Sequence, residues 1–248
     1  MIITGVTPRN AADGEDATLR GWPFELPPVA QLLRDGLTFT APVTLLVGEN
    51  GSGKSTIIEA IAEAYGVDRR GGHIGRDYAS PLEKAPLGRE IRLERTKVGR
   101  RMVGTKPRGY FLRAETAYGF FEYVSGTPAY DEHDLFSMSH GESFLAVFDV
   151  RFARQGLYLM DEPESALSFS STLKLLALLD DLRNTGSQVI CATHSPLLAA
   201  LSGAQILELG DHGIRTVPWN ELELVDHWRR FLAQPDSYLR YLIDNRET

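Results

Sequence analysis

Short apolar runs alternate with amphipathic segments along most of the chain. The runs that suit buried strands, being apolar and rich in β-branched or aromatic residues, are Val43–Val47, Arg108–Ala114, Leu157–Met160 and Gln188–Ala192. The segments that predict helices are Val29–Arg34, Ser55–Tyr65, Glu142–Ala153, Ser170–Leu182, Pro196–Leu201 and most of Asn220–Leu242, with a break at Pro235. Strands that alternate with helices indicate an α/β fold with a mostly parallel sheet.

Further strands are predicted outside these buried runs. Glu90–Lys97 alternates between polar and apolar residues, as in a half-exposed strand, and Gln205–Leu209 with Gly213–Val217 predicts a hairpin. The first forty residues otherwise predict loops, and Gly and Pro break the rest of 66–113 into irregular pieces. We expect a single domain over residues 1–248, made of a core lobe (1–65 and 155–220), an inserted lobe (66–154) and a C-terminal helical tail (220–248).

The composition is that of an ordinary soluble globular protein, with 43% hydrophobic and 24% charged residues. The single cysteine, Cys191, excludes an intrachain disulfide and favours a reducing compartment. The N-terminus lacks a basic stretch followed by an apolar run, and no apolar segment approaches the roughly 20 residues needed to cross a bilayer. We therefore expect a cytoplasmic protein with no transmembrane segment of its own.

Charge is distributed unevenly along the chain. The net charge is −7, yet residues 66–113 hold thirteen Lys or Arg against five Asp or Glu, a local net of +8. One interpretation is a solvated lobe at the edge of the sheet. The other is that Arg69–Arg113 forms a surface for nucleic acid or another polyanion, because phosphate contacts depend on local charge.

A phosphate-binding motif lies between a predicted strand and a predicted helix. Gly48–Ser55 (GENGSGKS) fits G-x-x-x-x-G-K-[ST], in which the glycines let successive backbone N–H groups face one anion at a helix N-terminus. A Gly-rich turn formed by chance is the alternative, and the flanking strand and helix argue against it. Lys54 is expected to reach the β- and γ-phosphates, and Ser55 to bind Mg²⁺. The residues expected to bind the nucleotide are Glu49, Asn50, Gly51, Ser52, Gly53, Lys54, Ser55 and Thr56.

Polar residues follow two further buried strands. Asp161 and Glu162 end the run Leu157–Met160, at the edge of the sheet where ligands of open α/β folds bind. Asp161 suits Mg²⁺, and Glu162 suits a general base that polarises the attacking water. His194 follows the next strand and is a candidate sensor of the γ-phosphate. The simpler alternatives are a strand that ends in solvated acids and a surface histidine.

These motifs together resemble those of the ATP-binding-cassette (ABC) ATPase superfamily. The family order is present over residues 43–196: the P-loop (Walker A), a signature sequence at Met138–Glu142, the Walker B strand with Glu162, a D-loop, and an H-loop at His194. The D-loop residues are Ser165, Ala166, Leu167 and Ser168. The resemblance implies a P-loop NTPase fold with a mostly parallel core sheet, an antiparallel β edge and a short helical signature lobe.

The resemblance also implies a homodimer that forms on ATP. In this family the signature of one subunit caps the γ-phosphate held by the other, so the signature residues would act in trans: Ser139, His140, Gly141 and Glu142. Ser139 and the amide of Gly141 would be the donors. The glutamine of the family's Q-loop is absent, and Glu115 lies near its place as a candidate Mg²⁺ ligand.

Departures from the family pattern favour its non-transporter branches. Glu142 in the signature, Glu164 after Walker B and Ser195-Pro196 after His194 resemble SMC-type and recombination-repair ATPases and small stand-alone bacterial ATPases. The short spacing between P-loop and signature excludes long coiled-coil arms. The sequence thus predicts an ATP hydrolase coupled to nucleic acid or to a partner protein. The ATP-binding subunit of a membrane transporter is the alternative, and a toxin–antitoxin or phage-defence ATPase cannot be separated from the first hypothesis.

Overall fold

The computed structural model describes residues 1–9, 21–73, 85–105, 108–113, 145, 148, 152 and 154–243. Its strands are β1 (Ile3–Pro8), β2 (Leu37–Thr38), β3 (Val43–Val47), β4 (Gly72–His73), β5 (Ile91–Arg95), β6 (Gly109–Arg113), β7 (Leu157–Asp161), β8 (Gln188–Thr193), β9 (Gln205–Gly210) and β10 (Gly213–Thr216). Its α-helices are α1 (Pro27–Asp35), α2 (Lys54–Tyr65), α3 (Pro86–Glu90), α4 (Lys97–Thr105), α7 (Phe169–Asn184), α8 (Pro196–Ala199), α9 (Glu223–Ala233) and α10 (Asp236–Ile243). Two short 3₁₀ turns are η2 (Pro163–Ala166) and η3 (Trp219–Glu221).

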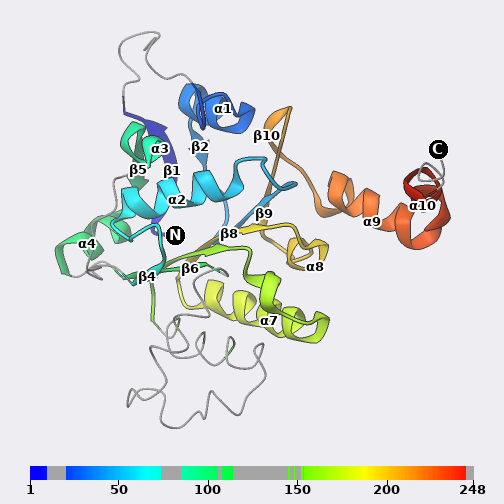
Figure 1. Cartoon of the computed structure of the whole chain (residues 1–248). Helices are drawn as coiled ribbons and strands as arrows, with labels where there is room; N and C mark the ends of the chain where they lie inside the picture. Colours follow the sequence, from blue (N-terminus) through cyan, green and yellow to red (C-terminus); the bar gives the residue numbers. More distant parts are fainter. Residues whose placement is uncertain are drawn as a thin grey trace.

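A seven-stranded sheet forms the centre of the molecule, in the order β10-β9-β3-β8-β7-β6-β4 (Figure 1). The five inner strands are parallel to one another, and the two edge strands β10 and β4 are antiparallel to their neighbours. The predicted α/β fold with a mostly parallel sheet is therefore confirmed. β4 and β6 belong to this sheet although they lie within residues 66–154, which the sequence assigned to an inserted lobe.

A second, three-stranded antiparallel sheet has the order β2-β1-β5. β1 was missed in the sequence, where the first forty residues were predicted as loops apart from one helix. It pairs with β5 over five positions, and Gln188 fixes its start by accepting from the amides of Ile2 and Ile3 at 2.7 and 2.8 Å. Strand formation here depends on partners about ninety residues away, which local periodicity cannot reveal.

Helices cover both faces of the central sheet. α2 lies between the central sheet and the three-stranded sheet, and its Ile57, Ile58 and Ile61 are buried in one core. α7 covers the opposite face with Leu175 and Leu179, in a second core. All five residues of β3 are buried because both faces of that strand are covered, which explains its continuous apolar run.

The basic segment contains regular structure that the sequence predicted as irregular. Lys97–Thr105 forms the helix α4, and the alternating stretch ends as a strand at Arg95 rather than at Lys97. The amide of Arg100 donates to the carbonyl of Thr96 at the start of this helix. Gly99 within this helix packs against the backbone of Ile2, where a Cβ would lie 2.0 Å from the carbonyl oxygen.

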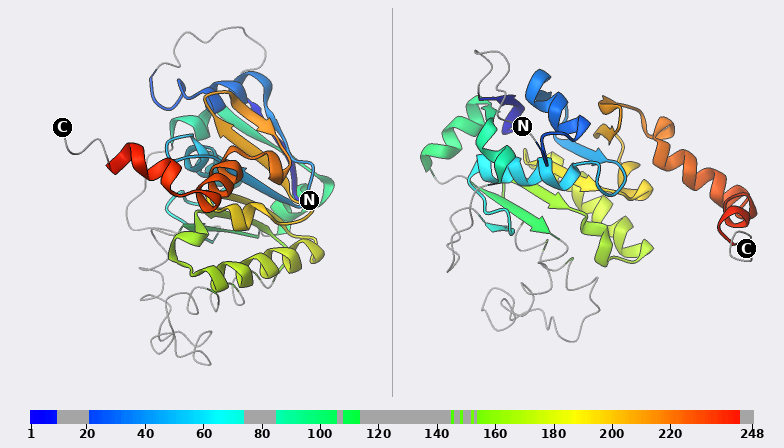
Figure 2. Two further views of the ribbon diagram at one scale, coloured as in Figure 1. Left: turned by 90° about the vertical axis from the view of Figure 1, so that its right-hand side faces the viewer. Right: turned by 45° about the horizontal axis from the view of Figure 1, so that its top comes forward.

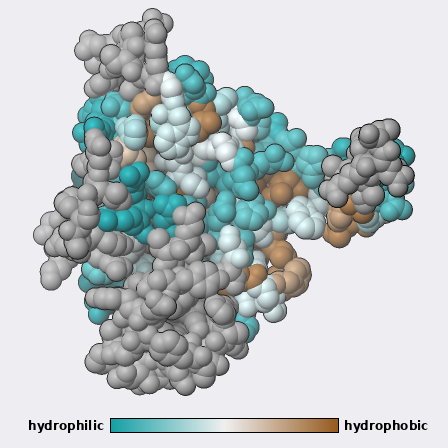
Figure 3. Space-filling view, in the orientation of Figure 1, coloured by the Kyte–Doolittle hydropathy of each residue, from teal (hydrophilic) through white to brown (hydrophobic). Residues whose placement is uncertain are grey.

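The C-terminal helices extend from the body as an arm. α9 and α10 are separated at Gln234-Pro235, where the sequence predicted a break, and Figures 1 and 2 show both helices projecting from the side of the molecule that carries the turn between β3 and α2. Apolar patches lie along the arm and where it leaves the body (Figure 3). Among the described residues, no helix is long and apolar enough to span a bilayer.

Candidate functional site

The P-loop, Gly48–Ser55, connects β3 to α2 as the motif predicted. Gly53 has φ 93°, in the left-handed region, and α2 begins at the next residue. Gly48 is required for space, because a Cβ there would lie 2.4 Å from the carbonyl oxygen of Leu209 on β9. The loop is thus held between its own helix and the neighbouring strand, with backbone N–H groups available at the N-terminus of α2.

The Lys54 side chain lies within the P-loop and is only 3% exposed. Its Nζ donates to the carbonyl oxygens of Gly48 and Glu49, both at 2.8 Å, and lies 3.9 Å from Glu162 Oε1. Burial lowers the pKa of Lys54, while the nearby carboxylates, that of Glu162 first, oppose the shift. A buried ammonium group in this position can form charge-assisted hydrogen bonds with a phosphate group.

Asp161 ends β7 next to the P-loop helix. Its Oδ1 accepts from the Ser55 hydroxyl at 2.9 Å, and its Oδ2 lies 3.5 Å from an Arg113 nitrogen. Burial raises the pKa of Asp161 to about 6, although the hydrogen bond from Ser55 and the charge of Arg113 act in the opposite direction. A carboxylate and a hydroxyl side by side are oxygen donors that fit Mg²⁺, and a bound cation would relieve the cost of burying this charge. Ser55 and Asp161, both expected to bind Mg²⁺, therefore lie in direct contact.

Glu162 follows β7 in an uncommon backbone conformation. It has φ 49° and ψ 51°, and among the described residues it is the one non-glycine residue with positive φ. Its amide donates to the carbonyl of Ala192 on β8 at 2.9 Å, which ties the turn to the neighbouring strand. Left-handed residues of this kind are over-represented at functional sites because the surrounding structure must hold them in place.

His194 follows β8 and lies opposite this turn. Its Nδ1 is 3.6 Å from Glu162 Oε1 and also 3.6 Å from Glu164 Oε1. Glu164 Oε1 in addition accepts from the His194 amide at 2.9 Å and from the Thr193 hydroxyl. The buried Glu164 therefore fixes the backbone from which the half-exposed His194 side chain projects.

The D-loop begins in the turn η2 and leads into α7. Ser168 is the N-cap of that helix, and its hydroxyl accepts from the Ser171 amide at 3.2 Å. Leu167 packs against the core beneath α7, while Ser165 is exposed. The D-loop is thereby held beside Glu162 by a helix cap and an apolar anchor.

Several predicted residues lie outside the described parts of the chain. These are the signature residues Ser139, His140, Gly141 and Glu142, the tentative metal ligand Glu115, and most of the predicted helix Glu142–Ala153. Their roles remain predictions. The residues that the structure brings together are Lys54, Ser55, Asp161, Glu162 and His194, which lie at or beyond the carboxyl ends of three neighbouring strands, β3, β8 and β7.

Two residues near this cluster were not predicted to have a role in it. Glu164 was noted only as a departure from the transporter pattern. Arg113 was not singled out, although it contacts both Asp161 and Glu59, the latter at 2.7 Å. The register of β6 against β7 places Arg113 directly opposite Asp161. Both β6 and β7 were predicted as strands, and aligning their carboxyl ends in a parallel pair could have suggested this contact.

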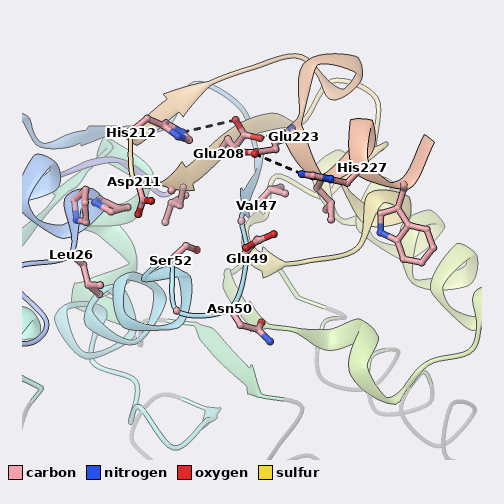
Figure 4. Close-up of a pocket in the computed structure, with 18 of the residues that line it drawn as sticks. Leu26, Val47, Glu49, Asn50, Ser52, Glu208, Asp211, His212, Glu223 and His227 are labelled. Carbon is pink, nitrogen blue, oxygen red and sulfur yellow. Dashed lines mark hydrogen bonds and ion pairs between the residues drawn. The ribbon is translucent and has the colours of Figure 1, made fainter. Parts of the chain in front are cut away.

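A groove lies on the other side of the P-loop, towards β9 (Figure 4). Four of the predicted nucleotide-binding residues contribute to its floor: Glu49, Asn50, Gly51 and Ser52. The groove extends beneath the turn between β9 and β10 to the helix α9. The P-loop therefore has an acidic and histidine-containing cluster on one side and an open groove on the other.

The arrangement can bind an anion and position a water molecule. Backbone N–H groups at the start of α2 and the Lys54 ammonium can hold phosphate oxygens. Asp161 and Ser55 can hold a divalent cation, and Glu162 is a carboxylate at the correct edge of the sheet to accept a proton. These are the elements of phosphoryl-transfer sites in P-loop NTPases.

Comparisons with known proteins agree with this geometry. Residues 128–200 match a family described as "AAA domain, putative AbiEii toxin, Type IV TA system", and residues 34–85 match a family described as "AAA domain". The chain is 30% identical over 187 residues to the ribose import ATP-binding protein RbsA 1 of Burkholderia ambifaria, covering 67% of this chain and 35% of that protein. It is 28% identical over 179 residues to the cytochrome c biogenesis ATP-binding export protein CcmA of Rhodopseudomonas palustris, covering 66% and 84%.

Solved structures with a similar arrangement include the SMC head domain from Thermotoga maritima, at 18% identity and a TM-score of 0.42, covering 74% of this chain and 92% of that one. The chain spans about two fifths of the length of the import proteins that it matches. The two family matches cover the P-loop and the segment from before the signature to the H-loop. With the arrangement of Lys54, Asp161, Glu162 and His194, they show that the chain contains a P-loop ATPase domain of the AAA/ABC type.

Proposed function

We propose that this chain binds ATP with Mg²⁺ and hydrolyses it as an ATP-bound homodimer, in a cycle coupled to nucleic acid or to a partner protein. The observation that carries the proposal is the meeting of Lys54, Ser55, Asp161, Glu162 and His194 at the carboxyl ends of three neighbouring strands. Each of these residue types matches one requirement of phosphoryl transfer.

The phosphate end of ATP would lie at the N-terminus of α2. Lys54 and the P-loop amides would neutralise the β- and γ-phosphates, and Ser55 with Asp161 would hold Mg²⁺. When bound, Mg²⁺ supplies electrostatic stabilisation of the charge on the transferring phosphoryl group. Arg113 keeps the Asp161 carboxylate oriented through its contact with Oδ2.

Glu162 would polarise the attacking water, and His194 would position the same water and the γ-phosphate. The backbone of Glu162 is tied to Ala192 and that of His194 to Glu164, so the two side chains are held facing each other across neighbouring strands. Catalytic groups fixed in this way need little rearrangement during reaction.

The homodimer follows from the family resemblance. Ser139 and the amide of Gly141 in one subunit would complete the γ-phosphate site of the other, so ATP would join the subunits and hydrolysis would release them. The D-loop turn starts directly after Glu162, whose Oε1 lies 3.9 Å from Lys54 Nζ, so the D-loop begins beside the P-loop, as such a shared site requires.

ATP turnover and light scattering test this proposal. We expect Lys54→Ala to lose ATP binding, and Glu162→Gln to bind ATP but to hydrolyse it very slowly and to accumulate as a dimer. If Glu162→Gln stays monomeric at saturating ATP and Mg²⁺, the shared site is wrong. Unchanged ATP affinity in Lys54→Ala would remove the P-loop assignment itself.

Nucleic acid is the coupled ligand that the charge distribution favours. Lys97 and Arg100 on α4 and Arg92 on β5 are exposed, and Figure 1 shows α4 at the side of the molecule opposite the C-terminal arm. By contrast, Arg69, Arg70 and Arg113 of the same basic segment are paired with carboxylates. The exposed subset therefore forms the candidate surface.

Binding of duplex DNA, single-stranded DNA and RNA should be measured by fluorescence anisotropy from about 50 to 200 mM salt. We expect affinity to fall steeply with salt, because each neutralised phosphate releases counterions. The single variants Lys97→Glu and Arg100→Glu should each bind more weakly, while Arg34→Glu, an exposed change of the same charge on α1, serves as the charge-matched control for a site elsewhere. Absence of binding at low salt would remove the nucleic-acid part of the proposal.

A transporter subunit is the second candidate, favoured by the similarity to sugar-import ATP-binding proteins. Co-purification with an integral membrane protein would support it. The family description that mentions a type IV toxin–antitoxin system favours instead a protein partner in such a system. Turnover that responds to a co-expressed neighbouring gene product, and not to nucleic acid, would support that reading.

A further inference from the structure

The groove on the β9 side of the P-loop is a cavity of about 670 Å³. One wall is formed by Leu26, Pro27 and Pro28 at the start of α1, and the roof by the turn Leu209–His212 (Figure 4). The far wall is formed by α9 and α10, which contribute the ring side chains His227, Trp228, Phe231 and Tyr238. This size is within the range of pockets that enclose small organic ligands.

The position of the groove follows from the sheet order. β3, which leads into the P-loop, lies between β9 on one side and β8 and then β7 on the other. The phosphate-binding and candidate catalytic residues, Lys54, Asp161 and His194, belong to the P-loop and to the β7–β8 side. A nucleotide whose γ-phosphate points towards that side must extend its nucleoside end in the opposite direction, towards β9.

The charges of the groove exclude the phosphate end from it. Of the described residues that line it, none is Lys or Arg, whereas four are carboxylates: Glu49, Glu208, Asp211 and Glu223. Glu49 and Asn50 are the P-loop residues at the edge of the groove. A polyphosphate would be repelled here, but ribose hydroxyls and base amino groups are donors that carboxylates accept.

The far wall is fixed to the body by a buried carboxylate. Glu208 is 4% exposed; it pairs with Arg215 on β10, and its Oε1 accepts from the Glu223 amide at 2.8 Å, at the first turn of α9. Val225 anchors the same turn in the core. A hydrogen bond of 3.1 Å joins His227 Nδ1 and the Tyr238 hydroxyl, and Phe231 packs edge-on against Tyr238. These contacts hold α10 against α9. The ring side chains are therefore held in place along the groove.

At the floor of the groove one polar atom has no protein partner. The Ser52 hydroxyl oxygen is buried and makes no hydrogen bond to any residue in the described part of the chain. Ser52 lies on the P-loop directly beneath the roof of the groove (Figure 4). A buried hydroxyl without a partner is costly, so the floor of the groove holds a hydrogen-bonding group that the protein leaves unused.

We propose that this groove holds the base and ribose of the bound nucleotide, and that Trp228 on α9 is the aromatic surface on which the base stacks. The inference rests on the proposed ATP binding and adds the part of the site for which the sequence offered no residue. Trp228 is 46% exposed and lines the groove, so its indole can be covered by a ligand. Stacking on an aromatic face suits any base and needs no hydrogen bond.

Calorimetric titration of the full chain with ATP and, separately, with inorganic tripolyphosphate tests the assignment. We expect Trp228→Ala to weaken ATP binding about ten- to a hundred-fold and to leave tripolyphosphate binding unchanged, since base stacking is the interaction removed. Trp228→Phe should retain most of the ATP affinity. Trp22→Ala is the matched control, because Trp22 is 72% exposed and does not line the groove.

The two ligands separate failure of this inference from failure of the proposed function. Lys54→Ala should lose both ligands; if it keeps both, the P-loop assignment fails. If Trp228→Ala binds ATP like the parent chain, or loses both ligands equally, the groove is not the nucleoside site, and ATP binding by the P-loop still stands. A loss in Trp22→Ala equal to that in Trp228→Ala would also overturn the assignment to α9.

Fluorescence provides a readout that does not depend on removing Trp228. The chain has three tryptophans, so the variant Trp22→Phe/Trp219→Phe leaves Trp228 as the single indole. ATP should quench its emission, and tripolyphosphate should not. Emission that ATP leaves unchanged, under conditions where calorimetry shows ATP bound, would overturn the proposal.

Discussion

The two sides of the P-loop differ in every property that matters for a nucleotide. On the β7–β8 side, Asp161, Glu162, Glu164 and His194 contact one another or the P-loop helix, and two of the carboxylates are buried. On the β9 side, the groove beside α9 is open and lined by ring side chains, prolines and carboxylates that are mostly exposed. We call these the catalytic side, after the function proposed for it, and the groove side.

The proposed functions give the two sides different physical tasks. Moving a phosphoryl group requires charges that are fixed and partly shielded from water, because electrostatic stabilisation is strong only where the environment does not screen it. Holding a base and a sugar requires contact area and a few hydrogen-bond acceptors, which an open groove supplies. The same loop can serve both tasks because β3 has a different neighbour on each side.

The largest expected effect on the catalytic side is on turnover in Glu162→Gln. Removing the proposed general base should lower the ATP hydrolysis rate about 10²- to 10⁴-fold, with ATP affinity retained. Phosphate release under single-turnover conditions measures the rate, and calorimetry measures binding. A variant with near-parental turnover would show that Glu162 is not the base.

Asp161→Asn should change how the free energy of unfolding depends on pH, because it removes one carboxyl group whose pKa is raised. Burial raises the pKa of the native carboxyl to about 6 from an ordinary value of 3.8, so the native state binds this proton more tightly than the unfolded chain. Without Mg²⁺, the contribution of Asp161 to the free energy of unfolding should therefore fall as pH rises from about 4 to about 6. The neutral amide should make the protein about 2–3 kcal/mol more stable than the parent at pH 7.

Urea unfolding at several pH values, with parent and variant compared, measures this difference. The stability gap should be large at pH 7 and should shrink towards pH 4, where the parent carboxyl is protonated. A gap independent of pH, or a less stable variant at pH 7, would contradict the assignment of the raised pKa to Asp161.

Glu164→Ala tests whether the catalytic side depends on a buried support. The change leaves the Thr193 hydroxyl and the His194 amide without their acceptor, which should cost about 2 kcal/mol of stability. Because His194 would lose its fixed position, turnover should fall about tenfold with little change in ATP affinity. Glu164→Gln, which keeps an acceptor oxygen, should recover most of the stability. Equal stability and turnover in parent and Glu164→Ala would exclude a positioning role.

The smallest expected effect is at the D-loop. Ser168→Ala removes the N-cap of α7 and should cost about 1 kcal/mol in thermal or urea unfolding. Ser168→Asp keeps an acceptor at the same position and should restore the stability. If both variants lose the same amount, the capping interpretation of Ser168 is wrong.

The inner parallel strands, the P-loop and the order of the motifs could be predicted from the amino-acid sequence. These features have local signals: continuous apolar runs for strands covered on both faces, and fixed spacing of glycines, Lys54 and Ser55 for the phosphate loop. The placement of Asp161 and His194 at the same edge as Lys54 also follows from local signals, because parallel strands end together. The hairpin of β9 and β10 and the break at Pro235 were predicted from turn and proline positions for the same reason.

The contacts between segments far apart in the chain could not be predicted and became known from the folded structure. β1 gains its partners from β5 and Gln188, far along the chain, so no window of sequence could identify it as a strand. The contact of Arg113 with Asp161 depends on the register between two strands, and the support of His194 by Glu164 depends on a strained turn at Glu162. The groove exists because Glu208 holds α9 beside the P-loop, and pairing between residues far apart in sequence is set by packing rather than by local pattern.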